Sequence, residues 1–159
     1  MKKSILALSL LLIPMAACAD VSVEWANPEG FKDPYYSSMK DAKSRQTILD
    51  DLKQFIVEQA SQYLKEGETL TLQVTDVDLA GEFQPWSKEP NVRVIKSPYF
   101  AHMSFAFKLT GADGKVIKED DSVSLTNMLL TPPALADRDT LEPYLRDSIR
   151  SWMSTNLHR

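Results

Sequence analysis

The sequence has little of what most catalytic and metal sites require. Its 159 residues include one cysteine and two histidines. The histidines, His102 and His158, lie far apart, and no cysteine pair exists. The sequence therefore predicts no transition-metal site, no disulfide and no cofactor. A G-x-S-x-G turn, a phosphate-binding loop and a dinucleotide fingerprint are also lacking, so the common hydrolase and nucleotide-binding signatures are missing.

Basic runs are lacking as well. The chain has 22 acidic and 18 basic residues, for a formal net charge of −4. Binding to nucleic acids and to anionic membranes depends largely on clustered Lys and Arg side chains. We therefore expect neither nucleic acid nor an anionic membrane surface among the ligands.

Long apolar runs are confined to the N-terminus. Lys2 and Lys3 precede the apolar stretch 5–13, and Ala17-Cys18-Ala19 has the small-x-small pattern of a signal-peptidase site. This pattern predicts a signal peptide at residues 1–19 and one exported, periplasmic domain at residues 20–159. The apolar stretch is too short to span a bilayer, and no later stretch approaches a membrane span.

Cys18 offers a second interpretation of this segment. Residues 15–18 (MAAC) loosely resemble a bacterial lipobox, in which the cysteine is lipidated and becomes the first residue. Cleavage after Ala19 instead removes 19 of the 159 residues and leaves 140, and the loss of two lysines changes the charge from −4 to −6. The mass of the mature N-terminus distinguishes the two alternatives.

Hydrophobic periodicity predicts an α+β fold in the order β-α-β-β-β-β-α. Alternation indicates strands at 21–25, 70–79, 92–95, 99–110 and 115–126. Apolar spacings of three and four indicate a helix over 41–65, ended by Gly67, and a second helix capped at Asp139 with Glu142 three residues later. We expect a two-layer sandwich, in which two helices cover one face of a mostly antiparallel sheet of about five strands.

Three local features refine this prediction. The apolar phase of the second strand changes after Val74, which predicts a β-bulge or the strand's end near Thr75 and Asp76. The acidic run Glu119-Asp120-Asp121 favours an edge position or a bulge for the last strand. We also expect Trp86 to fold back over the edge of the core, and residues 31–38 to form a loop held by aromatic side chains or, alternatively, an aromatic contact surface.

Charged residues gather around the end of the second strand. Asp76 and Asp78 are two positions apart, so they point to the same side of a regular strand. With Glu82 they could bind a cation or take part in acid–base chemistry. The alternative is that they accept turn amides or pair with Arg93 across the following connection.

The second candidate feature lies on the fourth strand. Its alternation places the apolar residues from Tyr99 to Leu109 on one face and His102, Ser104 and Lys108 on the other. With both helices on the first face, the other face is open, and it would carry Phe100, His102 and Ala106.

Three stretches resemble a known family: Val21 to Gly30 (VSVEWANPEG), Gly67 to Trp86 and Val92 to Lys96 (VRVIK). The run DVDLAGEFQPW, from Asp76 to Trp86, is the most specific. On these residues the chain resembles the bacterial domain-of-unknown-function family numbered 3016, over about residues 21–157. The resemblance implies a small exported protein without an assigned activity, and it supplies no catalytic residue.

These observations favour a non-enzymatic binding or envelope-accessory module that meets another envelope component or a small ligand. The candidate binding surface comprises Asp76, Asp78, Glu82, Trp86, Arg93 and His102. A small hydrolase using Asp76, Asp78 or His102 is the first alternative. A weak cation-binding protein using Glu119, Asp120 and Asp121 is the second. The sequence specifies neither the partner nor the oligomeric state, and it leaves the conformation of residues 127–137 open.

Overall fold

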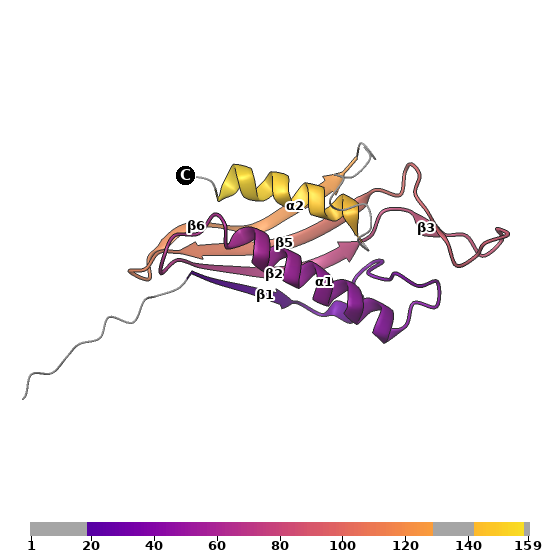
Figure 1. Cartoon of the computed structure of the whole chain (residues 1–159), viewed down its shortest axis with the longest axis horizontal. Coiled ribbons are helices and arrows are strands. Elements are labelled where there is room, and N and C mark those ends of the chain that lie inside the picture. The colour runs from indigo at the N-terminus through magenta and orange to yellow at the C-terminus, as the bar shows by residue number, and fades with distance from the viewer. Residues whose placement is uncertain (1–18, 129–141, 158–159) are drawn as a thin grey trace, which may run out of the picture.

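The computed structural model describes residues 19–128 and 142–157 and has two layers (Figure 1). One layer is a sheet of four strands in the order β1-β2-β5-β6, and the other consists of helices α1 and α2, which cover the same face of that sheet. The strands are β1 (Asp20–Trp25), β2 (Thr69–Asp78), β5 (Ala101–Thr110) and β6 (Val116–Asn127), and the helices are α1 (Ala42–Ala60) and α2 (Pro143–Asn156). The predicted α+β class and the placement of both helices on one face are confirmed.

The sheet is mixed. β1 pairs with β2 in parallel, and α1 supplies the crossover that a parallel pair needs. β2 and β5 pair antiparallel, and so do β5 and β6, which a tight turn at Gly111–Gly114 connects. β6 is an edge strand, and its register shifts opposite Phe105 and Phe107, where its acidic residues lie. Both features predicted for this strand are therefore present.

The irregularity predicted in the second strand is also present. The β2–β5 register shifts between Val74 and Asp76. Leu70, Leu72 and Val74 are buried before the shift, and Val77 is buried after it. Because one extra residue restores the inward position of the apolar side chains, Asp76 and Asp78 are placed on the face without helices.

The core lies between the sheet and the two helices. β1, β2, β5 and both helices contribute fully or nearly fully buried apolar side chains to it, such as Val23, Leu52, Leu72, Phe105 and Ile149. The edge strand β6 contributes only partly buried ones. Trp152 of α2 packs edge-on against both Phe105 and Phe107, with ring centroids 4.9 Å apart in each pair. The alternation predicted for the fourth strand is confirmed over β5, whose residues are buried at every second position.

Helix α1 is shorter than predicted. It begins after Asp41, whose carboxylate accepts a hydrogen bond from the Ser44 amide (2.7 Å). It ends at Ala60, not at 65, and Gly67 adopts its positive φ of 79° in the later turn that leads into β2. The apolar spacing misled the prediction because Tyr63 and Leu64 still pack against the core after the helical backbone has ended.

Two further expectations need correction. The strand predicted at 92–95 does not join the main sheet; β4 (Arg93–Val94) pairs only with β3 (Glu82–Phe83), and the two form a separate hairpin. Trp86 does not cover the core, since it is 76% exposed. An apolar residue in a long connection carries no periodic signal that fixes its direction.

The start of α2 also differs from the prediction. The helix begins at Pro143, with Glu142 as its N-cap residue, and not near Asp139, which lies outside the described residues. The expected signal peptide up to residue 18 and most of the 127–137 connection lie outside them as well. None of the described helices is long and apolar enough to cross a membrane.

Candidate functional site

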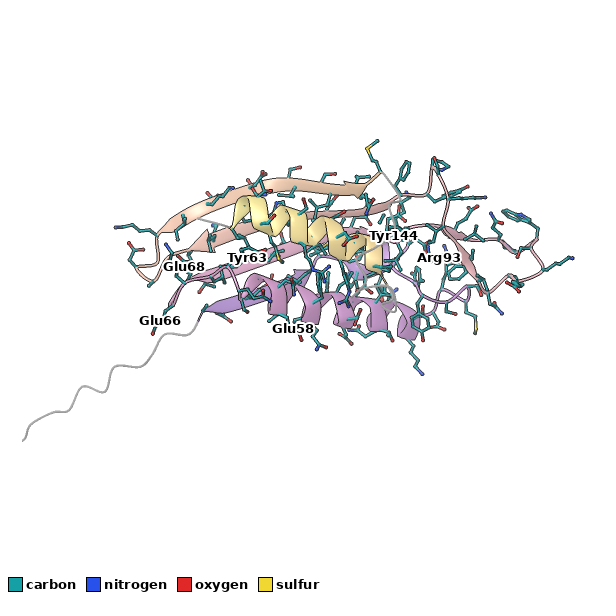
Figure 2. All side chains as sticks on the ribbon, turned by 45° about the horizontal axis from the view of Figure 1, so that its top comes forward. Glu58, Tyr63, Glu66, Glu68, Arg93 and Tyr144 are labelled. Atoms are coloured by element: carbon teal, nitrogen blue, oxygen red, sulfur yellow. The ribbon has the colours of Figure 1, made fainter. Side chains whose placement is uncertain are left out.

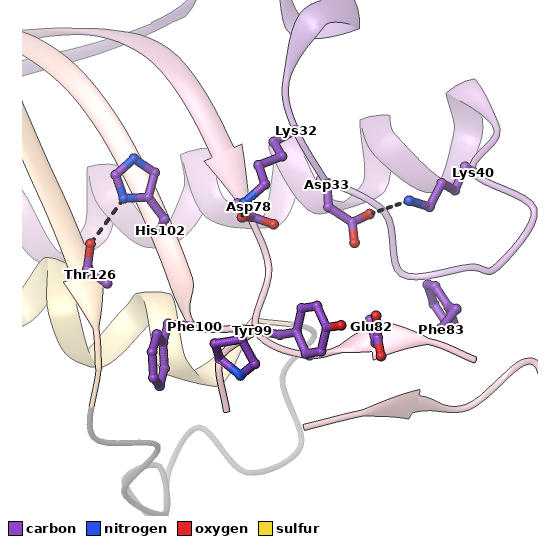
Figure 3. A pocket seen from close by; sticks show the side chains of 12 residues that line it. Lys32, Asp33, Lys40, Asp78, Glu82, Phe83, Tyr99, Phe100, His102 and Thr126 are labelled. Atoms are coloured by element: carbon purple, nitrogen blue, oxygen red, sulfur yellow. Dashed lines mark hydrogen bonds and ion pairs between the residues drawn. The ribbon is translucent and has the colours of Figure 1, made fainter. Parts of the chain in front are cut away.

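The strand ends at one side of the sheet form a pocket of about 550 Å³ (Figure 3). Its walls come from five segments: the 31–40 loop, the end of β2, the β3–β4 hairpin, the start of β5 and the end of β6. In Figure 2 this end of the molecule is marked by Arg93 and lies opposite the turn that carries Glu66 and Glu68. The pocket is therefore built from residues far apart in the sequence.

The 31–40 loop is fixed to β2 by main-chain hydrogen bonds. The amide of Asp33 donates to the carbonyl oxygen of Val77 (3.2 Å), and the amide of Leu79 donates to the carbonyl oxygen of Asp33 (3.1 Å). Asp33 and Asp78 thus form a single parallel bridge that continues the sheet by one residue. The loop is anchored further by Phe31, which is buried and meets Trp25 edge-on.

Arg93, in β4 of the hairpin, joins the hairpin to this loop. Its Nη2 donates to a carboxylate oxygen of Asp33 (3.1 Å) and to the carbonyl oxygen of Tyr35 (2.7 Å). Its Nη1 donates to the carbonyl oxygen of Gly81 (2.8 Å), and its guanidinium lies 4.6 Å from the ring centroid of Phe83. The carboxylate partner of Arg93 is therefore Asp33, and not Asp76 or Asp78 as the sequence-based alternative had it.

Gly81 allows the hairpin to approach the sheet closely. It has a positive φ of 79°, and its amide donates to the carbonyl oxygen of Tyr99 (2.8 Å). A Cβ atom at this position would clash with the carbonyl oxygen of Val94. The pocket wall between β3 and β5 consequently requires glycine here.

Carboxylates and ammonium groups alternate around the pocket. Lys32 Nζ lies 2.6 Å from a carboxylate oxygen of Asp78, and Lys40 Nζ lies 3.4 Å from one of Asp33. The hydrogen bond to Asp78 raises the pKa of Lys32 above its ordinary value. The main-chain amide of Lys32 donates to Asp76 (2.8 Å), which places both candidate aspartates beside one lysine.

Glu82, in β3 of the hairpin, and Tyr99, just before β5, form another part of the wall. A hydrogen bond from the side-chain amide of Gln84 holds the pKa of Glu82 below its ordinary value, and hydrogen bonds from Tyr99 and Lys96 act in the same direction. The same contact with Glu82 raises the pKa of the Tyr99 hydroxyl. Phe83 and Phe100 add aromatic rings to the lining.

His102 lies where the pocket meets the sheet. On the open face, two rows of polar residues run across neighbouring strands, and His102 belongs to the first row. Asp78 and Thr126 are its neighbours on β2 and β6, and Asp76 and Ser124 flank Ser104 in the next row. The ring of His102 hydrogen-bonds through Nε2 with Ser104 Oγ (2.8 Å) and through Nδ1 with Thr126 Oγ1 (3.1 Å). Both ring nitrogens therefore meet hydroxyl groups.

The structure brings most of the sequence-predicted candidates together. Asp78, Glu82 and His102 line the pocket, Asp76 accepts a hydrogen bond from the Lys32 main chain, and Arg93 is bonded to the lining residue Asp33. Trp86 is exposed and is not part of this lining.

Sequence reasoning missed the three charged lining residues of the 31–40 loop: Lys32, Asp33 and Lys40. They belong to a loop that was interpreted through its aromatic side chains. The only signal for Asp33 was its position in the charged start of that loop, FKDPYY. Their partners are distant in the sequence: Lys32 and Asp78 are 46 positions apart, and Asp33 and Arg93 are 60 positions apart.

The acidic run of β6, residues 119–121, does not line this pocket, and two of its side chains interact with neighbouring residues. Glu119 lies 3.3 Å from Lys108 Nζ, and Asp120 accepts a hydrogen bond from the Ser122 amide (2.9 Å). Within residues 19–128 and 142–157, no group of three or more His, Cys, Asp or Glu side chains is arranged to hold a metal ion.

A family model described as "Protein of unknown function (DUF3016)" matches residues 19–155. No curated protein shows significant similarity to the sequence. Among solved structures, the chain is similar to the crystal structure of protein XCC0632 from Xanthomonas campestris, of the family model DUF330. The two are 12% identical with a TM-score of 0.41, and the match covers 91% of this chain and 88% of that chain. A likeness at this level carries no argument about ligand or activity.

Proposed function

The chain belongs to the DUF3016 family, whose function is unknown, and on that premise we propose that it is a non-enzymatic, periplasmic binding module. The ligand or partner component of the envelope binds in the pocket formed by the 31–40 loop, the β3–β4 hairpin and the ends of β2 and β5. Export rests on the signal pattern of residues 1–19, with lipidation of Cys18 as the alternative route to the same compartment.

The observation that carries this proposal is the convergence of charged and aromatic side chains from four segments on one pocket. Specific sites typically combine an apolar or aromatic surface with a few placed polar groups. Here Tyr99 and Phe100 supply the rings, and Asp78, Glu82 and Lys32 supply the polar groups. Arg93 and Gly81 fix the frame that holds them.

The chemistry around His102 favours binding over catalysis. A general base of the Ser-His-Asp type needs an acidic group that orients the imidazole. His102 Nδ1 instead meets the Thr126 hydroxyl, and the carboxylate of Asp78 is bonded to Lys32 Nζ (2.6 Å).

Site-specific photo-crosslinking in intact cells tests the proposal. A photoreactive phenylalanine analogue at Phe100 probes the pocket, and the same analogue at Gln54, on the exposed side of α1, is the matched control. We expect one defined adduct from position 100, none from position 54, and loss of the adduct when Asp78→Asn and Glu82→Gln are added. Equal adducts from both positions, or none from either, would contradict a binding role for the pocket.

A small hydrolase is the second candidate, because one contact specifically favours it. Ser104 Oγ lies 2.8 Å from His102 Nε2, a distance that suits a nucleophile and its base. Incubation with an activated fluorophosphonate probe tests this candidate. Labelling of Ser104 that disappears in His102→Gln would support hydrolysis, whereas an unlabelled Ser104 would exclude a serine nucleophile.

A further inference from the structure

The three ion pairs that lysines form around the pocket share one asymmetry. In each pair the carboxylate is the buried partner and the lysine is the exposed one. The exposed side-chain fractions are 73% for Lys32 against 12% for Asp78, and 51% for Lys40 against 14% for Asp33. For Lys96 and Glu82 they are 44% and 23%. The negative groups therefore belong to the fixed wall, while the ammonium groups sit at the ends of long, solvated side chains.

Asp33 shows that the wall can accept a further donor. Its Oδ2 is bonded to Arg93 Nη2 (3.1 Å), but its Oδ1 is buried and makes no hydrogen bond. The ammonium group of Lys40 lies 3.4 Å from Oδ1. Since an unsatisfied buried acceptor is costly, a ligand that donates to Oδ1 would gain a contact that the free protein lacks.

Aromatic rings reinforce the preference for cations. Lys96 Nζ lies 5.5 Å from the ring centroid of Tyr99, and Lys40 Nζ lies 5.9 Å from that of Tyr35. Positive charge over an aromatic face is attracted by the ring's quadrupole. The protein's own lysines thus already occupy positions that suit an external ammonium group.

From this arrangement we infer that the pocket binds an alkylammonium group, which replaces the ammonium of Lys40 or Lys32 against the carboxylates of Asp33 and Asp78. The inference deepens the proposed binding function and depends on it. An anion is disfavoured, because the pocket lining carries three carboxylates against two lysine ammonium groups, and both lysines are already paired. The net charge of −4 agrees with a cationic ligand.

A free polyamine and a lysine side chain of a partner protein carry the same chemistry. The loop and hairpin that frame the pocket leave it open to solvent, as the exposure of both lysines indicates. The experiment therefore compares spermidine with a blocked lysine, Nα-acetyl-lysine amide. Tighter binding of the first indicates a polyamine ligand, and tighter binding of the second indicates a protein partner; either result supports ammonium recognition.

NMR titration of the purified exported chain provides the test. n-Butylammonium is the probe, and n-butanol and butyrate at equal ionic strength are the controls. We expect saturable shifts of the Gly81, Tyr99 and His102 amides with the amine alone. Saturation by butanol, or no saturable shift with butylammonium, would overturn the inference.

Matched variants sharpen the test. Lys40→Met and Lys32→Met remove the competing ammonium groups and should tighten amine binding several-fold. Lys53→Met, on the exposed side of α1, should leave it unchanged. Asp78→Asn should weaken binding about tenfold, as expected for the loss of one charged hydrogen bond.

Glu82→Gln guards against misfolding of the Asp78 variant, because Glu82 is more exposed. It should also weaken binding while the melting temperature stays unchanged. Unaltered affinity in both acidic variants would overturn the inference. Failure of amine binding together with a persistent crosslink at position 100 would reject only the ligand class and leave the binding function standing.

Discussion

The helix-covered face and the pocket end of the sheet are stabilised in different ways. Between the sheet and the helices, apolar side chains such as Ile48, Leu72 and Met103 are almost fully excluded from water. At the pocket end, ion pairs such as Asp33 with Arg93 and Asp78 with Lys32 join loops to strand ends. The first region holds the fold together, and the second arranges charge at its surface.

This difference separates stability from function. The stabilisation that comes from burying apolar surface does not depend on the direction of individual contacts. Partly buried charges, by contrast, destabilise the fold unless each has a partner. A pocket of this kind is maintained only by a frame that positions every partner, which here is the work of Arg93 and Gly81. Substitutions in the two regions should consequently differ in what they change.

The largest loss of stability is expected in the core. Phe105→Ala removes a ring that packs 4.9 Å from Trp152 and is 2% exposed. The free energy of unfolding should fall by about 3–5 kcal/mol, as large-to-small core changes do. Urea denaturation measures it, with Gln73→Ala on the exposed face as the control that should change stability by less than about 0.5 kcal/mol. Similar losses in both variants would contradict the assignment of the two faces.

Arg93→Ala should have the next largest effect. It leaves Asp33 buried without its main partner and deprives four carbonyl oxygens of their donor. We expect a loss of about 3 kcal/mol, because removing one member of a buried pair exposes the desolvation cost of the other. Adding Asp33→Asn should restore part of it. A double variant no more stable than Arg93→Ala alone would show that the pair is not the coupled unit described.

A pH dependence should arise away from the pocket, between the two helices. Arg146 donates to Glu142 through Nε (2.7 Å) and to Asp51 through Nη2 (2.6 Å), which ties α2 to α1. Burial, aided by the hydrogen bond with Asp51, raises the pKa of Glu142 to about 8. Glu142 Oε2 has no partner as a carboxylate oxygen, but once protonated it can donate to Asp51.

Glu142 has an ordinary pKa of 4.5 and a raised one in the folded state, so the folded protein holds the proton more tightly. Its contribution to stability is complete below pH 4.5, declines as the pH rises towards about 8, and is lost above that. The slope should be at most about 1.4 kcal/mol per pH unit. Chemical denaturation across this range should show a flatter profile for Glu142→Gln. An unchanged profile would place the titrating group elsewhere.

The smallest effect is expected for Lys32→Ala. The side chain is 73% exposed, so its pair with Asp78 should contribute about 1 kcal/mol or less, and less still in high salt. Thermal melts at low and high salt check this. A loss as large as that of Arg93→Ala would mean that Lys32 is required for the structure of the pocket. A ligand ammonium could then not replace the ammonium group of Lys32.

The core could be predicted because its signal is local. Alternation along the strand fixes which residues of β5 face inward, and the phase change after Val74 places the bulge in β2. Apolar spacing also identified the buried face of α1 but not its end, because Tyr63 and Leu64 continue to pack beyond Ala60. Apolar periodicity indicates which residues are buried. Buried residues can continue along the chain after the helix has ended, so periodicity alone does not locate the helix end.

The pocket could be predicted only in part. Asp78 and His102 were recognised as candidates because each is a polar residue on a strand whose face was known. Their partners depend on how loops fold back, and nothing local connects Asp33 to Arg93 or Lys32 to Asp78. The same limit explains the error for Trp86, because a residue in a loop has no strand or helix face from which its direction could be predicted.

Cysteine protection in intact cells tests the central claim most directly, since export with either form of processing leaves no free thiol in the chain. Thr126→Cys places a thiol at the pocket, and Gln54→Cys places one on the outer side of α1. A binding module that uses the pocket should show slower maleimide labelling at position 126 in cells than after purification, and equal rates at position 54. Equal rates at position 126, with protection at position 54, would contradict the account.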